Sequence, residues 1–383
     1  MGFTSSQESV KDLELWERFA HNFPVRQNLI YLNHAAVAPL CKPAADAIKF
    51  LADDCTSYGS LHYDKWMASY EGLRVAAARL INADRSEIAH VKNTSEGIAT
   101  IAMGLDWKPG DQIVAFLEEF PANFFPWKRL EQKGVSVTWL SITDPLERID
   151  EACRGARLLA ISFVQFLSGY RAPIQAIGEI CHRNRCIYVV DAIQGLGAFP
   201  LDVRACRIDA LASDGHKWML GPEGCGILYV ERSLQDRIEP VEFGWTNVAG
   251  YADYASRDMS LRRDAGRYEP GTLNTVGCYG LRAAIEFLLE VGVENIAPVV
   301  RGLADRIAQG AEAKGYQILL GPRKPESSSG IVCIRKPGFD DKETVRRLRA
   351  AGIAAAPRAG WVRLSPHFYI SPDDIEQTLE VLP

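Results

Sequence analysis

Residues 210–218 read Ala-Leu-Ala-Ser-Asp-Gly-His-Lys-Trp, an apolar strand-like run that ends in a polar turn around Lys217. Upstream, the apolar run from Cys186 to Val190 ends at Asp191, and Gln194 follows shortly after. Short apolar runs of this kind are typical of strands in a parallel sheet, which is buried on both faces. Open parallel sheets bind ligands at the carboxyl ends of their strands. We therefore expect Lys217 and Asp191 at strand ends where a ligand binds.

Strand and helix patterns alternate through the middle of the chain, which is the order of a parallel sheet covered by helices. The loops between these segments are short. This pattern predicts one domain of the α/β class. Its predicted strands are Gln112–Leu117, Ser136–Leu140, Arg157–Phe163, Cys186–Val190, Ala210–Ser213 and Gly226–Val230, and its predicted helices are Ser95–Met103, Pro126–Lys133 and Ile174–Asn184.

The pattern changes beyond about residue 280, where a smaller α+β domain is expected. A chain of 383 residues exceeds the size at which one core keeps growing, so two domains are natural. We expect an amino-terminal arm (1–30), a large domain (31–280) and a small carboxyl-terminal domain (281–383). The predicted elements of the small domain are the helices Leu281–Val291, Val299–Lys314 (with Pro298 at its start) and Lys342–Ala351, and the strands Ser329–Ile334 and Trp361–Ser365. The composition of residues 244–266, rich in Tyr, Asp and Gly, predicts a long loop, and loops of this length are usually either functional or mobile.

The composition indicates which binding partners and which cellular compartment to expect. The net charge of −5 and the lack of a dense Lys/Arg run argue against nucleic-acid binding. No apolar stretch is long enough for a membrane span, so no membrane association is expected. The nine cysteines contain no CxxC pair, which argues against a disulfide scaffold or a zinc site and favours a reducing cytoplasm. His182 lies between Cys181 and Cys186, but it fits the polar face of a helix better than a metal site, and no metal is expected.

Lys217 and Asp191 have chemistry in common. A buried lysine loses its charge readily, and a neutral amine attacks an aldehyde to form a Schiff base. A carboxylate at a neighbouring strand end can keep a pyridine nitrogen protonated, which makes the ring an electron sink. Each residue also has a plain structural interpretation: Lys217 as a surface-reaching side chain at a strand edge, and Asp191 as a turn or helix-capping residue.

Two segments are candidates for phosphate binding. Asn93-Thr94-Ser95-Glu96-Gly97 precedes a helical run, so hydroxyls and free backbone N–H groups would meet where an anion is favoured. The alternative is an ordinary helix cap. Glu269-Pro270-Gly271-Thr272 is a second candidate in a turn-rich segment, and its alternative is a simple loop.

Taken together, these motifs resemble the class V aminotransferase family of enzymes that use pyridoxal 5′-phosphate (PLP). The resemblance rests on Asp191-x-x-Gln194, Gly215-His216-Lys217, Thr94-Ser95-Glu96 and Pro270-Gly271-Thr272-x-Asn274, and it extends from Tyr31 to Ser365. It implies fold type I: a large domain with a mainly parallel sheet and a smaller α+β carboxyl-terminal domain.

The resemblance also implies roles for single residues. Lys217 would bind PLP covalently, Asp191 would pair with the pyridine nitrogen, and Gln194 would contact the ring hydroxyl. Thr94, Ser95 and His216 would bind the phosphate, and Ser213 and Gly271 would also contact the cofactor. Thr272 would reach the phosphate of a neighbouring subunit, which implies a homodimer with shared sites. Arg363 would bind the substrate α-carboxylate, and Asn33 and Ala36 would line the substrate pocket.

Departures from the cysteine desulfurase branch bear on the reaction. Phe120 stands where desulfurases stack a histidine on PLP, and the resemblance implies that Phe120 stacks on the cofactor instead. Phe166 stands where desulfurases have an asparagine near the ring hydroxyl. No cysteine lies between Arg358 and Arg363, so sulfur capture by the usual route of desulfurases is not expected.

The resemblance implies that an amino acid displaces Lys217 from PLP, and that the freed lysine then removes the Cα proton of this amino acid. We expect a transaminase or a lyase acting on a small amino acid. An epimerase of the isopenicillin N epimerase type is an alternative, although Phe120 offers no proton and His34, Tyr170 or water would have to supply one. A degenerate, non-catalytic binding protein is the alternative from a different class.

Overall fold

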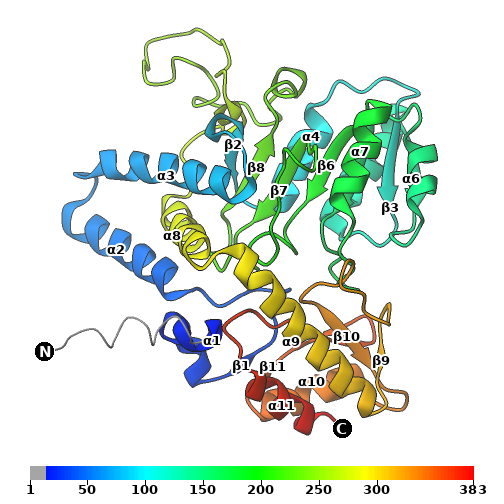
Figure 1. Cartoon of the computed structure of the whole chain (residues 1–383). Helices are drawn as coiled ribbons and strands as arrows, with labels where there is room; N and C mark the ends of the chain where they lie inside the picture. Colours follow the sequence, from blue (N-terminus) through cyan, green and yellow to red (C-terminus); the bar gives the residue numbers. More distant parts are fainter. Residues whose placement is uncertain (1–13) are drawn as a thin grey trace, which may run out of the picture.

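A seven-stranded sheet lies at the centre of the larger part of the protein (Figure 1). The computed structural model describes residues 14–383, so the first thirteen residues of the expected arm lie outside the described part. The strand order is β2-β8-β7-β6-β5-β3-β4, and β8 runs antiparallel to both of its neighbours while the other pairs are parallel. The strands are β2 (Ile88–Val91), β3 (Gln112–Phe116), β4 (Ser136–Leu140), β5 (Leu158–Ser162), β6 (Ile187–Asp191), β7 (Ala210–Asp214) and β8 (Gly226–Val230).

The six predicted strands are confirmed, with ends that shift by no more than one residue. They were recognisable because both faces of the sheet are covered. Along β6, for example, Tyr188 and Val190 belong to one buried cluster, while Ile187 and Val189 belong to another on the opposite face. A strand buried on both faces is apolar at every position, which is the pattern that the sequence displays. The mainly parallel α/β architecture is therefore confirmed.

Helices cover both faces of this sheet (Figure 1). They are α4 (Thr94–Gly104), α5 (Phe125–Arg129), α6 (Leu146–Cys153) and α7 (Ile174–Asn184). The elements that the sequence did not predict include α2 (Lys42–Tyr58), α3 (Tyr63–Ile81), β2 and α6. The helices α2 and α3 pack against α8 (Thr275–Val291). The helix α8 begins six residues before the predicted helix Leu281–Val291. The predicted helix Pro126–Lys133 is divided between α5 and a 3₁₀ turn, Leu130–Lys133.

The carboxyl-terminal part contains a four-stranded antiparallel sheet of order β12-β13-β10-β9. Its strands are β9 (Gln317–Ile318), β10 (Val332–Arg335), β12 (Ala356–Arg358) and β13 (Trp361–Leu364), and its helices are α9 (Val293–Ala313), α10 (Asp341–Ala350) and α11 (Pro372–Val381). Near the amino terminus, α1 (Leu15–Arg18) precedes β1 (Ile30–Tyr31), which pairs with β11 (Ile353–Ala354).

The predicted start of the long helix at Pro298 is wrong. The helix α9 begins at Val293, and Pro298 lies inside it. Proline removes one intrahelical hydrogen bond, but the residues around it still bury a continuous apolar face that includes Val293, Ile296 and Val300. Burial of that face outweighs the lost bond, so the helix continues through the proline.

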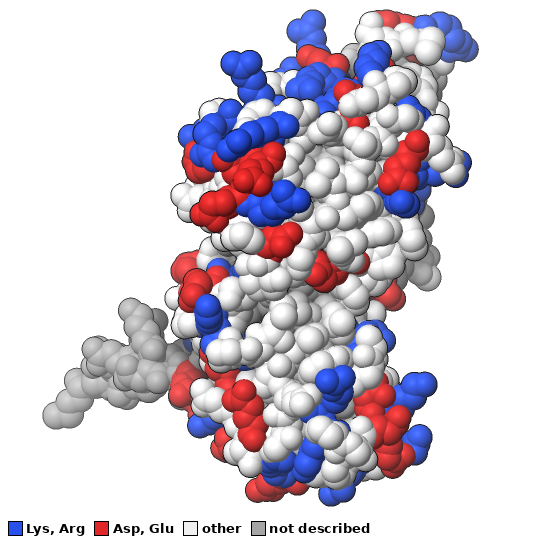
Figure 2. Space-filling model, turned by 90° about the vertical axis from the view of Figure 1, so that its right-hand side faces the viewer, with Lys and Arg blue, Asp and Glu red and all other residues white. Residues whose placement is uncertain are grey.

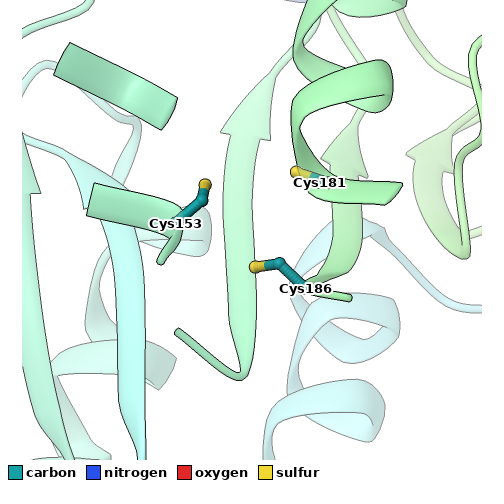
Figure 3. A group of neighbouring side chains, drawn as sticks. All are labelled: Cys153, Cys181 and Cys186. Carbon is teal, nitrogen blue, oxygen red and sulfur yellow. The ribbon is translucent and has the colours of Figure 1, made fainter. Parts of the chain in front are cut away.

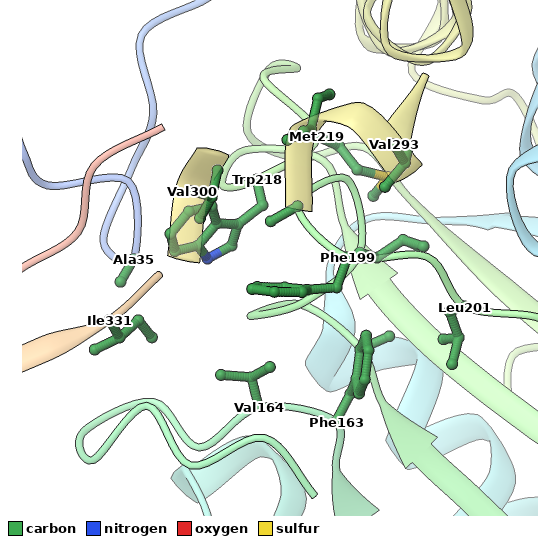
Figure 4. Close-up of a cluster of buried hydrophobic side chains, with 14 of the residues drawn as sticks. Ala35, Phe163, Val164, Phe199, Leu201, Trp218, Met219, Val293, Val300 and Ile331 are labelled. Atoms are coloured by element: carbon green, nitrogen blue, oxygen red, sulfur yellow. The ribbon is translucent and has the colours of Figure 1, made fainter. Parts of the chain in front are cut away.

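A shared apolar core joins the two parts next to the Lys217 turn (Figure 4). Trp218 packs there near Val300 of α9 and Ile331 just before β10. A Cβ atom added at Gly330 would lie 2.5 Å from atoms of both Trp218 and Val300, so only glycine fits at this contact. The residue after Lys217 is thus packed against the carboxyl-terminal part.

The surface has charges of mixed sign. In Figure 2, Lys and Arg side chains lie beside Asp and Glu side chains toward the two ends of the view, with a mostly uncharged band between them. The expected long loop has no regular helix or strand from 244 to 264. Within the described residues, none of the helices combines the length and apolar composition needed to cross a membrane.

Candidate active site

A cavity of about 540 Å³ opens at the carboxyl ends of β6 and β7. It brings together side chains from segments that are far apart in the sequence, including the turns after both strands and the start of α4. The lining residues used below are Ala36, Thr94, Ser95, Phe120, Phe166, Asp191, Gln194, Asp214, His216, Lys217, Arg358 and Arg363. Most of the residues singled out in the sequence therefore line one cavity.

Lys217 and Asp191 influence each other's protonation inside this cavity. Burial lowers the pKa of Lys217 to about 8, against the opposing effect of the Asp191 charge. Burial raises the pKa of Asp191 to about 6, although its carboxylate accepts a 3.1 Å hydrogen bond from the Ile193 amide and is near Lys217. A lysine whose neutral form is accessible near neutral pH is suited to attack on an aldehyde.

The start of α4 forms one wall. Asn93 caps this helix through its side chain, which accepts a 2.9 Å hydrogen bond from the Glu96 amide. Thr94 and Ser95 are the first two residues of the helix, and amides in the first turn of a helix have no partner within it. The amide of Asp214 donates to Thr94 Oγ1 at 3.0 Å, which ties this wall to the end of β7. The arrangement is suited to an anion such as a phosphate.

Asp214, and not Ser213, faces the cavity beside His216. The side chain of Ser213 is fully buried in β7, and its Oγ donates to the Asp214 carbonyl oxygen at 3.4 Å. The carboxylate of Asp214 lies 3.0 Å from His216 Nδ1 and accepts a 2.7 Å bond from the Gly215 amide. Successive side chains of a strand point to opposite faces, so Ser213 and Asp214 cannot both face the cavity. Ser213 is not among the residues that line the cavity, and its expected contact with the cofactor stays a prediction.

Gln194 has protein partners at both ends of its amide. Its Nε2 donates to the Ala35 carbonyl at 2.9 Å, and its Oε1 accepts from Trp218 Nε1 at 3.0 Å. The second hydrogen on Nε2 is what it can offer to a ligand. Gln194 therefore connects the turn after β6 with the turn after β7 as well as lining the cavity.

Two arginines approach the cavity from the small sheet. Arg363 on β13 is buried, and its Nη1 donates to the Phe166 carbonyl at 2.7 Å. Burial lowers the pKa of Arg363 to about 10, and the positive charge of Arg358 acts in the same direction. Arg358 ends β12 and is exposed. The sequence did not single it out as a site residue, because nothing in its local pattern separates it from a surface arginine.

Two phenylalanines, Phe120 and Phe166, line the cavity together with Lys217. The rings of Phe120 and Phe166 pack edge to face with centroids 5.3 Å apart, and the Lys217 ammonium nitrogen is 5.7 Å from the centre of the Phe120 ring. Neither ring can donate or accept a proton in acid–base chemistry. A planar ligand attached to Lys217 would have an apolar surface to stack against.

Of the residues singled out near the amino terminus, only some line the cavity. Ala36 lines the cavity, whereas Asn33 is not among the lining residues, and its Oδ1 is buried without a partner in the described structure. His34 is fully buried, with its ring nitrogens 2.8 Å from the Ser365 carbonyl oxygen and 2.7 Å from the Tyr369 hydroxyl. Tyr170 also lies outside the lining. Neither His34 nor Tyr170 is placed to supply a proton in this cavity.

Gly271 and Thr272 line two other, smaller cavities, neither of which includes Lys217 in its lining. Glu269, two residues before Gly271, is buried and accepts hydrogen bonds from the His90 amide at 2.8 Å and from Arg74 Nη2 at 2.6 Å. These bonds hold the base of the turn, while Thr272 itself is exposed. Within one chain, the structure therefore does not bring Thr272 to the Lys217 cavity.

Three cysteines meet elsewhere in the fold (Figure 3). The sulfur atoms of Cys153, Cys181 and Cys186 lie within 4.8 Å of one another, and all three residues are buried. His182 is exposed and does not join them. Structural zinc sites take four ligands, and the described residues provide three here, so the group fits the common role of cysteine as a small apolar core residue.

The cavity residues fit PLP chemically. An amine, a carboxylate and the first residues of a helix line one space, and they match an aldehyde, a ring nitrogen and a phosphate respectively. The sequence missed Asp214 and Arg358 as lining residues.

Comparisons with known proteins agree with this chemistry. A family model described as "Aminotransferase class-V" matches residues 30–362. A probable cysteine desulfurase from Pyrococcus abyssi is 30% identical, covering 94% of this chain and 95% of its own, and an uncharacterized aminotransferase from Bacillus subtilis, YcbU, is 28% identical, covering 95% and 96%. Among solved structures, a cysteine desulfurase from Thermococcus onnurineus superposes with a TM-score of 0.89 at 26% identity, covering 97% of this chain and 98% of that one. A cystine C–S lyase, solved with its product cysteine persulfide, superposes with a TM-score of 0.86 at 22% identity, covering 94% and 98%.

Proposed function

Given that this chain belongs to the class V aminotransferase family of PLP-dependent enzymes, we propose that it is a lyase that removes a sulfur-bearing β substituent from an amino acid with two carboxylates, of which cystine is the model. The pair Arg358 and Arg363, which line one cavity, is the observation that carries this proposal. One guanidinium would bind the α-carboxylate and the other a second carboxylate, since arginine binds carboxylates through two parallel hydrogen bonds.

The residues around Lys217 support removal of the Cα proton. Bound PLP makes the Cα proton of an attached amino acid acidic. Lys217 would bind the cofactor and, once released, take this proton, because the lowered pKa leaves a fraction of its amine neutral at neutral pH. Asp191 would hold the ring nitrogen, while Thr94, Ser95 and His216 would hold the phosphate. Arg363 would orient the substrate so that its Cα faces Lys217.

The apolar side of the cavity supports a leaving group that needs no proton. Phe120 and Phe166 cannot protonate a departing atom. A disulfide substituent leaves as a persulfide anion, which is more stable than a simple thiolate. Cystine and water would then yield pyruvate, ammonia and cysteine persulfide in equal amounts.

The connection between β12 and β13 argues against a persulfide carried on the enzyme. Ala359 and Gly360 form a two-residue turn, and both have positive φ angles, 50° and 80°, as in a tight hairpin. This hairpin leaves no room for a loop bearing a cysteine. Cys333, which pairs with Arg363 across the sheet, is buried, and burial raises the pKa of its thiol to about 12. A thiol in that state is a poor nucleophile at neutral pH.

We further propose a homodimer with shared sites in a reducing compartment such as the cytoplasm. The proposal is supported by Thr272, which is exposed, follows the hydrogen-bonded Glu269 and is not among the residues lining the Lys217 cavity of its own chain. All nine cysteines are free in the described structure, which suits a reducing environment.

The proposed substrate class is tested by kinetics with cystine and with β-chloroalanine, which has one carboxylate and a good leaving group. Loss of a charged hydrogen-bond partner in Arg358→Ala should raise KM for cystine about 10- to 100-fold and change KM for β-chloroalanine little. Arg363→Ala should impair both. Arg335→Ala is the matched control, since its guanidinium lies over Trp361, 4.4 Å from the ring centre and outside the cavity lining. Equal effects of Arg358→Ala on both substrates would contradict the proposal.

A further inference from the structure

Glu119 is a buried carboxylate with no assigned role, and it lies directly beside the cavity. Its side chain is 6% exposed, and it follows β3 on a loop that leads to Phe120. Its Oε1 accepts hydrogen bonds from the Ser162 amide at 2.7 Å and from Gln165 Nε2 at 3.1 Å, and its Oε2 accepts from the Ser162 hydroxyl. All of these partners are buried, so the carboxylate joins the loop after β3 to the segment after β5.

The two segments joined by Glu119 carry the two cavity phenylalanines. Phe120 immediately follows Glu119, and Phe166 immediately follows Gln165. In both segments, the residue that makes the Glu119–Gln165 hydrogen bond is therefore the direct neighbour of a phenylalanine in the edge-to-face contact. A shift of either segment would move a ring relative to Lys217.

We propose that Glu119 is a positioning residue that holds Phe120 against Phe166, so that the Phe120 ring covers one face of the PLP ring. The proposal rests on PLP binding at Lys217 and not on the lyase reaction. It also explains why a carboxylate is tolerated in this core: three donors converge on it, and few other side chains accept that many hydrogen bonds.

The charge on Glu119 is not required for this role. Burial raises the pKa of Glu119 to about 7, and the nearby charge of Asp191 acts in the same direction. A glutamine at 119 can make the same connection with its amide oxygen in the place of Oε1, where it accepts from the Ser162 amide and from Gln165 Nε2. Its NH2 group then faces the Ser162 hydroxyl, whose oxygen can accept a hydrogen bond.

The experiment measures PLP affinity and the visible circular dichroism of bound PLP in Glu119→Ala, Glu119→Gln, Phe120→Ala and the double variant Glu119→Ala/Phe120→Ala. Glu119→Ala and Phe120→Ala should each weaken PLP binding about 10-fold and reduce the dichroism, as expected for loss of an aromatic contact. The double variant should be no weaker than Phe120→Ala alone, because Glu119 acts through that ring. Glu119→Gln should stay within about threefold of the wild type in affinity, with its dichroism retained.

Glu87→Ala is the matched control. Glu87 is also buried, and it accepts bonds from two backbone amides, those of Asp84 at 2.9 Å and Arg232 at 3.1 Å, away from the cavity. Its variant should lose stability but keep PLP affinity within about twofold. The proposal is overturned if the effects of Glu119→Ala and Phe120→Ala multiply in the double variant, or if Glu119→Gln loses the dichroism as Phe120→Ala does. Should Glu119→Ala not fold, the Glu119→Gln result still decides.

Discussion

Trp218 donates a hydrogen bond from Nε1 to Gln194 Oε1 at 3.0 Å. Trp218 follows Lys217, and Gln194 lies three residues after Asp191, so this bond connects the two turns that carry the central residues of the site. Both side chains are buried. The distance between the lysine and the aspartate is therefore maintained by their neighbours as well as by the sheet.

The first prediction concerns this bond. Gln194→Leu should lower the free energy of unfolding of the cofactor-free protein by about 1–3 kcal/mol, because the Trp218 N–H and the Ala35 carbonyl lose a buried partner. Trp218→Phe removes the donor. Chemical denaturation of both single variants and the double variant checks this: the double variant should lose less than the sum of the two. Additive losses would show that the bond does not couple the turns.

The second prediction concerns the pH dependence of stability. The folded-state pKa of Asp191 is raised from 3.8 to about 6, so folding favours its neutral form. The cost of burying the charged form is absent below pH 4 and is complete above the folded pKa. Asp191→Asn should therefore stabilise the cofactor-free protein by up to about 3 kcal/mol above pH 7 and by almost nothing at pH 3. Denaturant titrations at both pH values measure this, and an equal difference at both would refute it.

The third prediction concerns the contact between the two parts of the chain. Gly330→Ala should destabilise the protein by about 1–3 kcal/mol, because its Cβ would overlap Trp218 and Val300. Gly302→Ala is the matched control: it lies in α9 with no atom within 4 Å of an added Cβ. That variant should gain up to about 1 kcal/mol from helix propensity. Thermal unfolding compares them, and a harmless Gly330→Ala would contradict the packing described.

The fourth prediction tests shared sites. Lys217→Ala and Thr272→Asp should each be inactive as pure proteins, the second because its carboxylate repels a phosphate. A mixed dimer would combine an intact Lys217 from one chain with an intact Thr272 from the other. Refolding the two together in equal amounts should restore about a quarter of wild-type activity. If the mixture stays inactive although light scattering shows dimers, the sites are not shared.

The sequence predicted the sheet well and its surroundings less well, for physical reasons. Strands such as β6 are apolar at every position because both faces are covered. By contrast, β2 is four residues long and contains His90, whose burial depends on Glu269, 179 residues away. The helix α2 has only two buried side chains, Ala44 and Leu51, so its pattern is weak. Contacts over such sequence distances leave no local pattern.

The same reasoning applies to the site. Residues in motifs next to strand ends, such as Lys217, Asp191 and Thr94, were found because their neighbours identify them. Glu119 and Arg358 were missed because their importance comes from tertiary contacts with segments that are distant in the chain. Ser213 was expected at the cofactor, but Asp214, the next residue along β7, is the one that lines the cavity, because successive side chains of a strand point to opposite faces.

The most direct test of the central claim is the product balance from cystine. The purified PLP-loaded enzyme is incubated with cystine, and pyruvate, ammonia and cysteine persulfide are measured together over time. The account predicts equal amounts of all three, with no persulfide attached to the protein, and no products from Lys217→Ala. Formation of alanine from cysteine with sulfur bound to the enzyme, or of a keto acid that retains its β substituent, would contradict it.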